Sequence, residues 1–335
     1  MIKKLGKFAA AAVVYVSFAV YLYQPYFKHF DKLQHLIIVN ICLAALGCFV
    51  LSRRWVSSFW GSFFAGAVYG FGPFTLWLSS YHPIAGLLVV AIPWLFCPAV
   101  FIAKDKWRWI TVPLLALPFL AVLLFFRLSV HLRLFAIPVQ AKLHLADLPS
   151  LLAPLAMVNR GSILVGFYHV PIAALMMGFL MLIAARRFGP ICVFAIGAVL
   201  AFCGPFLNIS PVIWLAIPIL CCSVLVGMGM QGLVLAGFAD RKWVLASTIM
   251  MLVFALTALL LATKYFQIFA GLGDKFARLL AETAKMYILG AVAAAVIFFM
   301  ARAKLRVTVL RLVLMSSAIA VDIFFSARFI VDRIF

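Results

Sequence analysis

One acidic residue stands out because it falls inside an apolar run: Asp322, in the stretch MSSAIAVDIFFSAR. A carboxyl group in the hydrocarbon region of a membrane is costly, so Asp322 is a candidate proton or cation site. Arg311, eleven residues earlier on the same helical face, is about 16 Å away and too far to pair directly. A carboxyl near the outer surface, neutral or paired with an arginine of another span, is the structural alternative.

Two histidines form the second candidate group. His35 lies 18 residues before Arg53, and His169 lies 17 residues before Arg186. Histidines in such related positions could face one cavity as a proton relay or a metal pair. A single histidine in a membrane helix more often hydrogen-bonds to a neighbouring helix, and a haem would need two facing histidines deeper in the bilayer. We therefore expect no metal site and no cofactor.

A third group lies in the longest break between apolar runs, residues 128–160. Its chemically capable side chains are His131, Arg133, His144, Asp147 and Arg160. On the outer face of a membrane they would be the catalytic group of an enzyme that acts on lipid-linked substrates. The chain has a single glutamate, Glu282, and no clustered carboxylates or nucleotide loop. Enzymatic activity is therefore left open, although the lack of clustered carboxylates and of a nucleotide loop argues against it.

Composition indicates which elements must position these residues. The chain has 335 residues, of which 68% are hydrophobic and only 11% are charged. A soluble domain is nearer half apolar and a quarter charged. Apolar runs of helix length recur along the whole chain, so we predict an all-α polytopic transmembrane helical bundle of about 11 spans. The expected spans are 7–24, 35–52, 57–78, 83–103, 108–127, 162–185, 189–207, 211–238, 243–263, 285–301 and 307–329.

The net charge of +20 would suggest nucleic acid in a soluble protein. Here the basic residues sit at span ends, where membrane lipids are the expected partners and nucleic acid is not. A membrane-protein partner or a homo-oligomer stays open. If the N-terminus is cytoplasmic, sixteen of the 28 Lys and Arg residues fall on the cytoplasmic side of the membrane. The positive-inside rule then predicts a multi-pass protein of a bacterial inner membrane, with its C-terminus periplasmic or extracellular.

Two stretches resemble each other and predict an internal repeat. RRWVSSFWGSFFAGAVYGFGPF begins at Arg53, and RRFGPICVFAIGAVLAFCGPF begins at Arg186. An even number of spans gives both copies the same orientation, so the repeat would be a parallel duplication of a four-helix unit. The chain would form one integral membrane domain, 1–335. Its parts are a first span (1–30), repeat unit 1 (31–127), an outer interfacial or re-entrant segment (128–160), repeat unit 2 (161–264), and an interfacial helix with the last two spans (265–335).

Pro93 and Pro218 occupy matching positions in the two units, each within Ala-Ile-Pro. A proline inside a helix frees a backbone carbonyl, and broken helices related by symmetry are where transporters often bind substrate. The alternative is that prolines are simply frequent in membrane helices. Gly227-Met-Gly-Met-Gln-Gly232 matches GxGxxG but lies inside an apolar run with no preceding strand, so it is not a dinucleotide site.

These observations predict a permease-like or flippase-like protein that moves a small or amphipathic substrate. An integral membrane enzyme for lipid-linked substrates and a non-catalytic subunit of a larger complex are the alternatives. Asp31-Lys32-Leu33-Gln34-His35 resembles the Asp-Lys…His opening of VanZ-like membrane proteins, over five residues of 335. No family is assigned on that resemblance.

Overall fold

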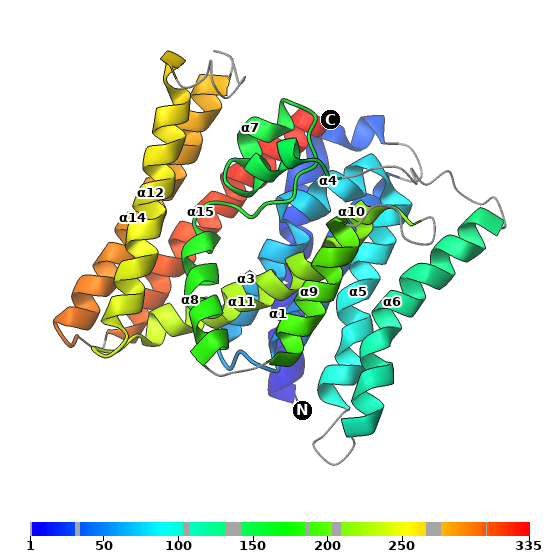
Figure 1. Cartoon of the computed structure of the whole chain (residues 1–335), viewed down its shortest axis with the longest axis horizontal. Coiled ribbons are helices and arrows are strands. Elements are labelled where there is room, and N and C mark those ends of the chain that lie inside the picture. Colours follow the sequence, from blue (N-terminus) through cyan, green and yellow to red (C-terminus); the bar gives the residue numbers. More distant parts are fainter. Residues whose placement is uncertain are drawn as a thin grey trace.

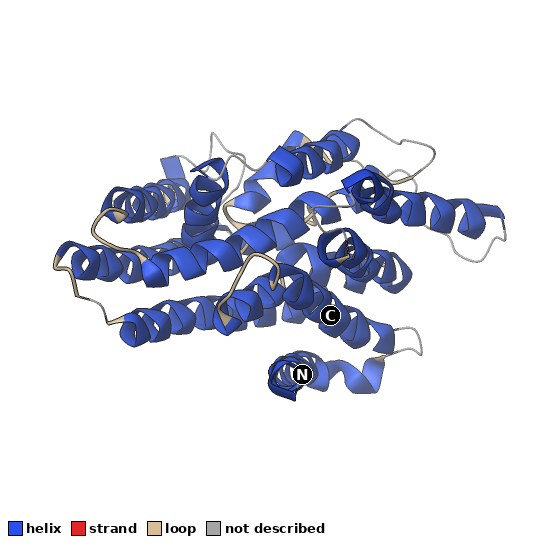
Figure 2. Cartoon of the chain, turned by 90° about the horizontal axis from the view of Figure 1, so that it is seen from below, coloured by secondary structure: helices blue, strands red, loops and turns tan. Residues whose placement is uncertain are grey.

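The computed structural model describes residues 2–30, 34–102, 108–131, 143–184, 188–202, 209–265, 276–305 and 307–335. These residues form helices and connecting segments without a strand (Figure 2). The all-α prediction is therefore confirmed. Helices are the expected solution for so apolar a chain, because they satisfy their backbone hydrogen bonds internally.

The helices divide into a long and a short class. The elements in chain order are α1 (Ile2–Tyr23), η1 (Gln24–His29), α2 (His35–Ser52), α3 (Phe59–Gly70), α4 (Pro73–Tyr81), α5 (Pro83–Phe101), α6 (Arg108–His131), η3 (Leu145–Leu151), α7 (Pro154–Val158), α8 (Pro171–Ala184), α9 (Phe188–Phe202), α10 (Pro211–Trp214), α11 (Ala216–Leu235), α12 (Arg241–Ala262), α14 (Ala277–Arg302) and α15 (Thr308–Ile334). Within the described ranges, eight helical segments are long and apolar enough to cross a membrane. The short helices α8 and α9 and the interrupted pair α3–α4 stand where the other three spans were predicted, so the count of about 11 stays a prediction.

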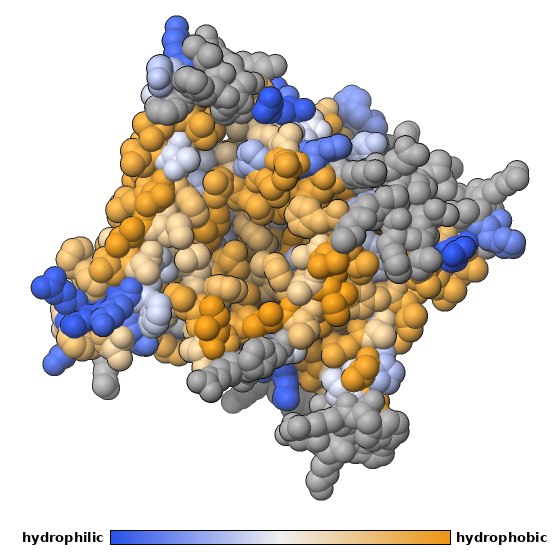
Figure 3. Space-filling view, in the orientation of Figure 1, coloured by the Kyte–Doolittle hydropathy of each residue, from blue (hydrophilic) through white to orange (hydrophobic). Residues whose placement is uncertain are grey.

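Most of the long helices run between two opposite edges of the molecule, whereas α11 crosses its middle obliquely (Figure 1). The N-terminus lies at the lower edge in that view and the C-terminus at the upper edge. Hydrophobic residues form a broad band between hydrophilic residues at the two edges (Figure 3). Large apolar side chains are exposed on several helices, including Val112, Val199, Leu256 and Phe299. Apolar surface of this extent needs lipid around it, so the chain is a membrane protein.

Helix α11 lies at the centre of the bundle and packs against α3, α8 and α9. Its glycines permit that packing. A Cβ atom on Gly229 would lie 1.7 Å from the carbonyl oxygen of Ala174 in α8, and one on Gly227 would lie 2.7 Å from that of Gly61 in α3. The GxGxxG match is therefore a helix-packing motif, in which absent side chains let backbones approach closely.

Two of the predicted continuous spans are interrupted. Span 57–78 breaks at Phe71 and Gly72, between α3 and α4, and Pro73 starts the second piece. Span 162–185 is helical only from Pro171, because residues 162–168 are non-helical. Both new helices begin with proline, which lacks an N–H group and is well suited to the first helical position. Hydropathy did not reveal either break, since apolar residues continue through both.

Residues 277–285 form the first turns of α14 rather than a separate interfacial helix. The stretch has one buried face and one charged face. Phe276, Leu279, Leu280 and Thr283 are buried, whereas Lys285 is exposed and paired with Glu282. The stretch is amphipathic because one face of a 26-residue helix packs on the bundle.

The two proposed repeat units differ in their packing. Helix α3 packs against α2 and α11, whereas its counterpart α9 packs against α10 and α11. Gly66 lies against Tyr15 and Ala45, while the equivalent Gly197 lies against Ile217 and Pro218. The helix neighbours therefore give no support to the duplication, which stays a prediction from the sequence.

Candidate functional site

Asp322 lies in the middle of α15, the last helix. It follows Thr308 by fourteen residues and precedes Ile334 by twelve, which places it about 21 Å and 18 Å from the two ends. Its side chain is fully buried. The buried face of α15 recurs at three- and four-residue spacing through Met315, Ile319, Asp322 and Ser326, so helical periodicity directs the carboxylate into the bundle.

Three donors surround the Asp322 carboxylate. His169 Nδ1 lies 3.0 Å from Oδ1, and Ser326 Oγ donates to the same oxygen at 3.1 Å. The backbone N–H of Val170 donates to Oδ2 at 2.6 Å. The sequence singled out Asp322 and His169 separately, and the structure brings them together across 153 residues.

The non-helical segment 162–168 positions His169. This segment is largely buried, with Leu164 and Tyr168 fully covered. It lies against η3, where Ser150 Oγ accepts a hydrogen bond from Val165 N at 3.0 Å. Helix α8 then starts at Pro171, so Val170 N–H is one of the free donors at a helix N-terminus. Asp322 therefore supplies from another helix the negative charge and the acceptor that this N-terminus favours.

The two nitrogens of the His169 ring have different surroundings. With Asp322 ionised, Nδ1 carries a proton and donates it to the carboxylate. Nε2 is buried and has no hydrogen-bond partner among the described residues. The ring packs edge-on against Tyr287 of α14, with centroids 5.0 Å apart at 86°. The pair can therefore hold one proton between histidine and aspartate, with a second nitrogen free to accept or release another.

Two tyrosines beside the Asp322–His169 pair donate hydrogen bonds to non-helical backbone nearby. Tyr168 OH donates to the carbonyl oxygen of Phe71 at the α3–α4 break, at 2.6 Å. Tyr287 OH donates to the carbonyl oxygen of Leu152, between η3 and α7, at 2.7 Å. The two interrupted segments of the chain thus meet beside Asp322. Non-helical backbone inside a membrane bundle requires such partners, because no water is present to satisfy it.

His35 does not belong to this site. It is the exposed first residue of α2 and packs edge-on against Phe30 at 5.6 Å, so the predicted pairing with His169 is not formed. Pro93 lies inside α5, where its carbonyl oxygen accepts from Cys97 Sγ at 3.3 Å. Pro218 lies in the first turn of α11 and so does not interrupt that helix. Neither proline has a hydrogen bond to the Asp322 pair.

The described members of the outer candidate group are engaged in separate contacts. Asp147 is buried, and its two oxygens accept from the backbone N–H groups of His144 and Ile163 at 2.8 and 3.1 Å. It thereby fixes η3 to the 162–168 segment. His131 is the exposed last residue of α6, and Arg160 lies over the Phe276 ring at 5.9 Å. Arg133 lies outside the described residues, as do Asp31 and Lys32 of the five-residue motif.

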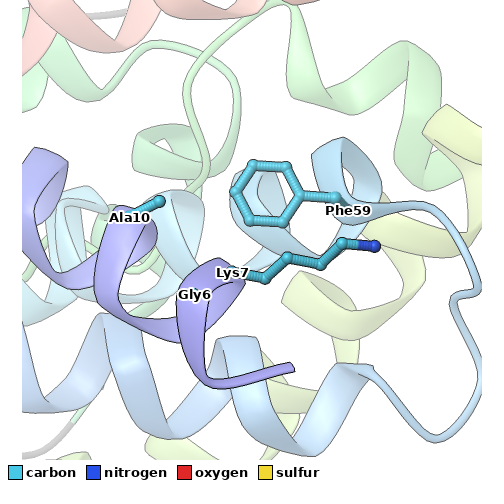
Figure 4. Close-up of a pocket in the computed structure, with 4 residues that line it drawn as sticks. All are labelled: Gly6, Lys7, Ala10 and Phe59. Atoms are coloured by element: carbon cyan, nitrogen blue, oxygen red, sulfur yellow. The ribbon is translucent and has the colours of Figure 1, made fainter. Parts of the chain in front are cut away.

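Two features of the site were not predicted from sequence: the Val170 N–H donor and the Tyr287 contact. A proline two residues after a membrane histidine is the signal that could have indicated the helix start. The residues described contain no group of three or more His, Cys, Asp or Glu side chains that could hold a metal ion. An open hollow lined by Gly6, Lys7, Ala10 and Phe59 lies elsewhere, between the starts of α1 and α3 (Figure 4).

No protein-family model, curated protein or solved structure matches this chain. Its function must therefore be argued from the site itself.

Proposed function

We propose that the chain is a permease-like or flippase-like transporter in which the Asp322–His169 pair couples substrate movement to a proton. The observation that carries the proposal is the position of the pair. A buried carboxylate in the middle of α15 meets the N-terminus of a helix that begins inside the bundle. Secondary transporters commonly place coupling and substrate sites where discontinuous helices end near the bilayer midplane.

The length of α8 supports this interpretation. Its 14 residues span about 21 Å, less than the roughly 30 Å hydrocarbon core of a bilayer. The remaining path would be formed by segment 162–168, which is buried and packed on other irregular backbone. Interrupted segments of this kind can move relative to long helices, because few internal hydrogen bonds hold them to one conformation.

Proton coupling is favoured over metal-ion coupling by the groups present. The pair and Ser326 together offer one carboxylate, one imidazole and one hydroxyl, which is sparse for a divalent cation but sufficient to bind and release protons. An ionisable pair within a membrane helix bundle is characteristic of proton relays in pumps and transporters. Substrate binding would replace one of the three groups that donate hydrogen bonds to Asp322 with a group of the substrate. This replacement would change the protonation of Asp322.

The remaining parts of the proposal concern topology and location. We propose about 11 crossings, a parallel duplication of a four-helix unit, and a bacterial inner membrane with a cytoplasmic N-terminus. Support for the orientation comes from Figure 1, where the N-terminus and the short connections after α2 and α14 lie at the same lower edge. These connections carry Arg53, Arg54 and Lys304, and Arg302 is the last residue of α14, as the positive-inside rule expects at the cytoplasmic side.

The two other functions have weaker support. An enzyme for lipid-linked substrates would need the outer histidines and Asp147 at one reaction centre, but the Asp147 oxygens are engaged with backbone donors. A non-catalytic subunit would need no ionisable pair inside the bundle. Either one becomes the better explanation if Asp322 has no effect on flux.

Proton flux measured in inverted membrane vesicles tests the proposal. Vesicles containing the full chain are energised, and a pH-sensitive dye reports proton efflux when candidate solutes or short-chain fluorescent phospholipids are added. The wild-type chain should release protons with at least one substrate class. Asp322→Asn should abolish that response, because the amide cannot carry the proton.

Asp332→Asn is the matched control, since this carboxyl lies on the same helix but is exposed and paired with Arg328. It should leave the flux unchanged. Equal proton release from the wild-type chain and from Asp322→Asn, with both proteins folded, would remove Asp322 from the mechanism.

A further inference from the structure

The connections α11–α12 and α14–α15 meet at one end of the bundle. Arg311, buried near the start of α15, donates through Nη1 to the carbonyl oxygen of Ala236 and through Nη2 to that of Leu305 at 2.7 Å. One side chain thus binds the ends of both connections. The meeting point lies at the lower left of Figure 1, where α12 begins and α14 ends.

Four basic residues surround this meeting point, which we call the basic corner: Arg241, Lys242, Arg302 and Lys304. None of them takes part in an ion pair within the described part of the chain. The nearby carboxylate, Asp240, accepts a hydrogen bond from Gly237 N at 2.9 Å. With four cations and this single carboxylate, the corner keeps an excess of positive charge, and Figure 3 shows hydrophilic residues gathered in the same place.

An aromatic ring organises two of these charges. Phe238 is 44% exposed, and the Arg241 guanidinium lies over its ring at 3.9 Å from the centroid. Lys304 Nζ lies 5.5 Å from the same centroid. A guanidinium stacked on a ring keeps its N–H edges free for a phosphate group. The ring thus holds Arg241 and Lys304 close together on one side of the corner.

Apolar surface continues directly from the charges. Leu235, Phe299 and Val309 are exposed on α11, α14 and α15, one or a few turns from the basic residues. Trp243, in the first turn of α12, is also exposed and is of a type enriched at membrane interfaces. A free phosphate would use only the cations, whereas a phospholipid would also use the apolar surface for its acyl chains.

We infer that the basic corner is a binding site for an anionic phospholipid, whose phosphate lies against Arg241 and Lys304 and whose chains lie along α12 and α14. Basic pockets between transmembrane helices on the cytoplasmic side bind such headgroups. The site is separate from the Asp322 pair and does not depend on the transport proposal.

Lipid titration of the purified full-length chain in detergent tests this site. Phosphatidylglycerol and phosphatidylcholine with identical acyl chains are titrated separately, and binding is followed by native mass spectrometry. Phosphatidylglycerol should bind at least tenfold more tightly than phosphatidylcholine. The double variant Arg241→Gln/Lys304→Gln should weaken phosphatidylglycerol binding by about 25-fold, since each basic residue contributes roughly fivefold at a membrane surface.

Two further variants separate a site from diffuse charge attraction. Arg278→Gln/Lys285→Gln removes the same charge from α14 far from its Arg302 end and should change the affinity less than twofold. Phe238→Ala keeps all charges but removes the ring and should weaken binding about threefold or more. A Phe238→Ala affinity equal to wild type, or an equal loss in both double variants, would overturn the site.

Inorganic phosphate identifies the source of the ligand. At millimolar concentration it should leave bound phosphatidylglycerol in place, because it cannot replace the acyl-chain contacts. Displacement of the lipid by inorganic phosphate would show that the corner recognises a free anion, and would overturn the assignment to lipid. Thermal unfolding of every variant confirms that each compared protein is folded.

Discussion

At the scale of single residues, the Asp322 carboxylate accepts hydrogen bonds from donors in two parts of the chain. His169 and the Val170 N–H come from the segment before α8, and Ser326 comes from the next turn of α15. All of these groups are buried, so each donor would lose the one acceptor it has among the described residues if the carboxylate were removed. The same residue is therefore both the candidate coupling group and a stabilising connection between α8 and α15.

Removing this acceptor should be expensive. Asp322→Ala leaves three buried donors unpaired, and breaking a buried pair by removing one partner costs about 3–5 kcal/mol. Asp332→Ala on the same helix removes an exposed pair with Arg328 and should cost less than about 1 kcal/mol. Denaturant unfolding in detergent measures both values. Equal losses of stability would contradict the buried network described for Asp322.

At the scale of helices, close approach depends on the glycines of α11. Gly229→Ala places a methyl group 1.7 Å from the carbonyl oxygen of Ala174, so α8 and α11 must separate. The expected loss of stability is about 1–3 kcal/mol or more. Gly189→Ala is the control, because a Cβ atom there meets nothing within 4 Å. Thermal unfolding should show a lower midpoint for the first variant and no decrease for the second.

Whether an element could be predicted from the sequence depends on whether a local pattern or a distant contact determines it. The long helices could be predicted from apolar runs, because a helix that crosses the lipid needs about 20 apolar residues. The breaks at Gly72 and before Pro171 were not readable from hydropathy, since a buried extended segment is as apolar as a helix. Asp322 and His169 were each recognisable as costly residues. Their contact spans 153 residues and depends on packing that no local pattern encodes.

At the scale of the whole molecule, the parity of the crossings determines where the two ends lie. An odd number of crossings puts the N- and C-termini on opposite sides of the membrane, whereas the eight long apolar segments alone would put them on the same side. The termini lie at opposite edges of the bundle in Figure 1. Opposite termini require that α3–α4, α8 and α9 together contribute an odd number of crossings.

Cysteine labelling tests this parity directly. Single cysteines replace Gly6, Arg160 and Arg333, all exposed, in a background without the seven native cysteines. In intact cells of a bacterial host, an impermeant maleimide should label the Arg160 and Arg333 positions at once. The Gly6 position should react only after the membrane is permeabilised, because basic termini are retained in the cytoplasm. Labelling of Gly6 and Arg333 from the same side would require an even number of crossings, so that α3–α4, α8 and α9 together would contribute an even number and the predicted count of about 11 would be wrong.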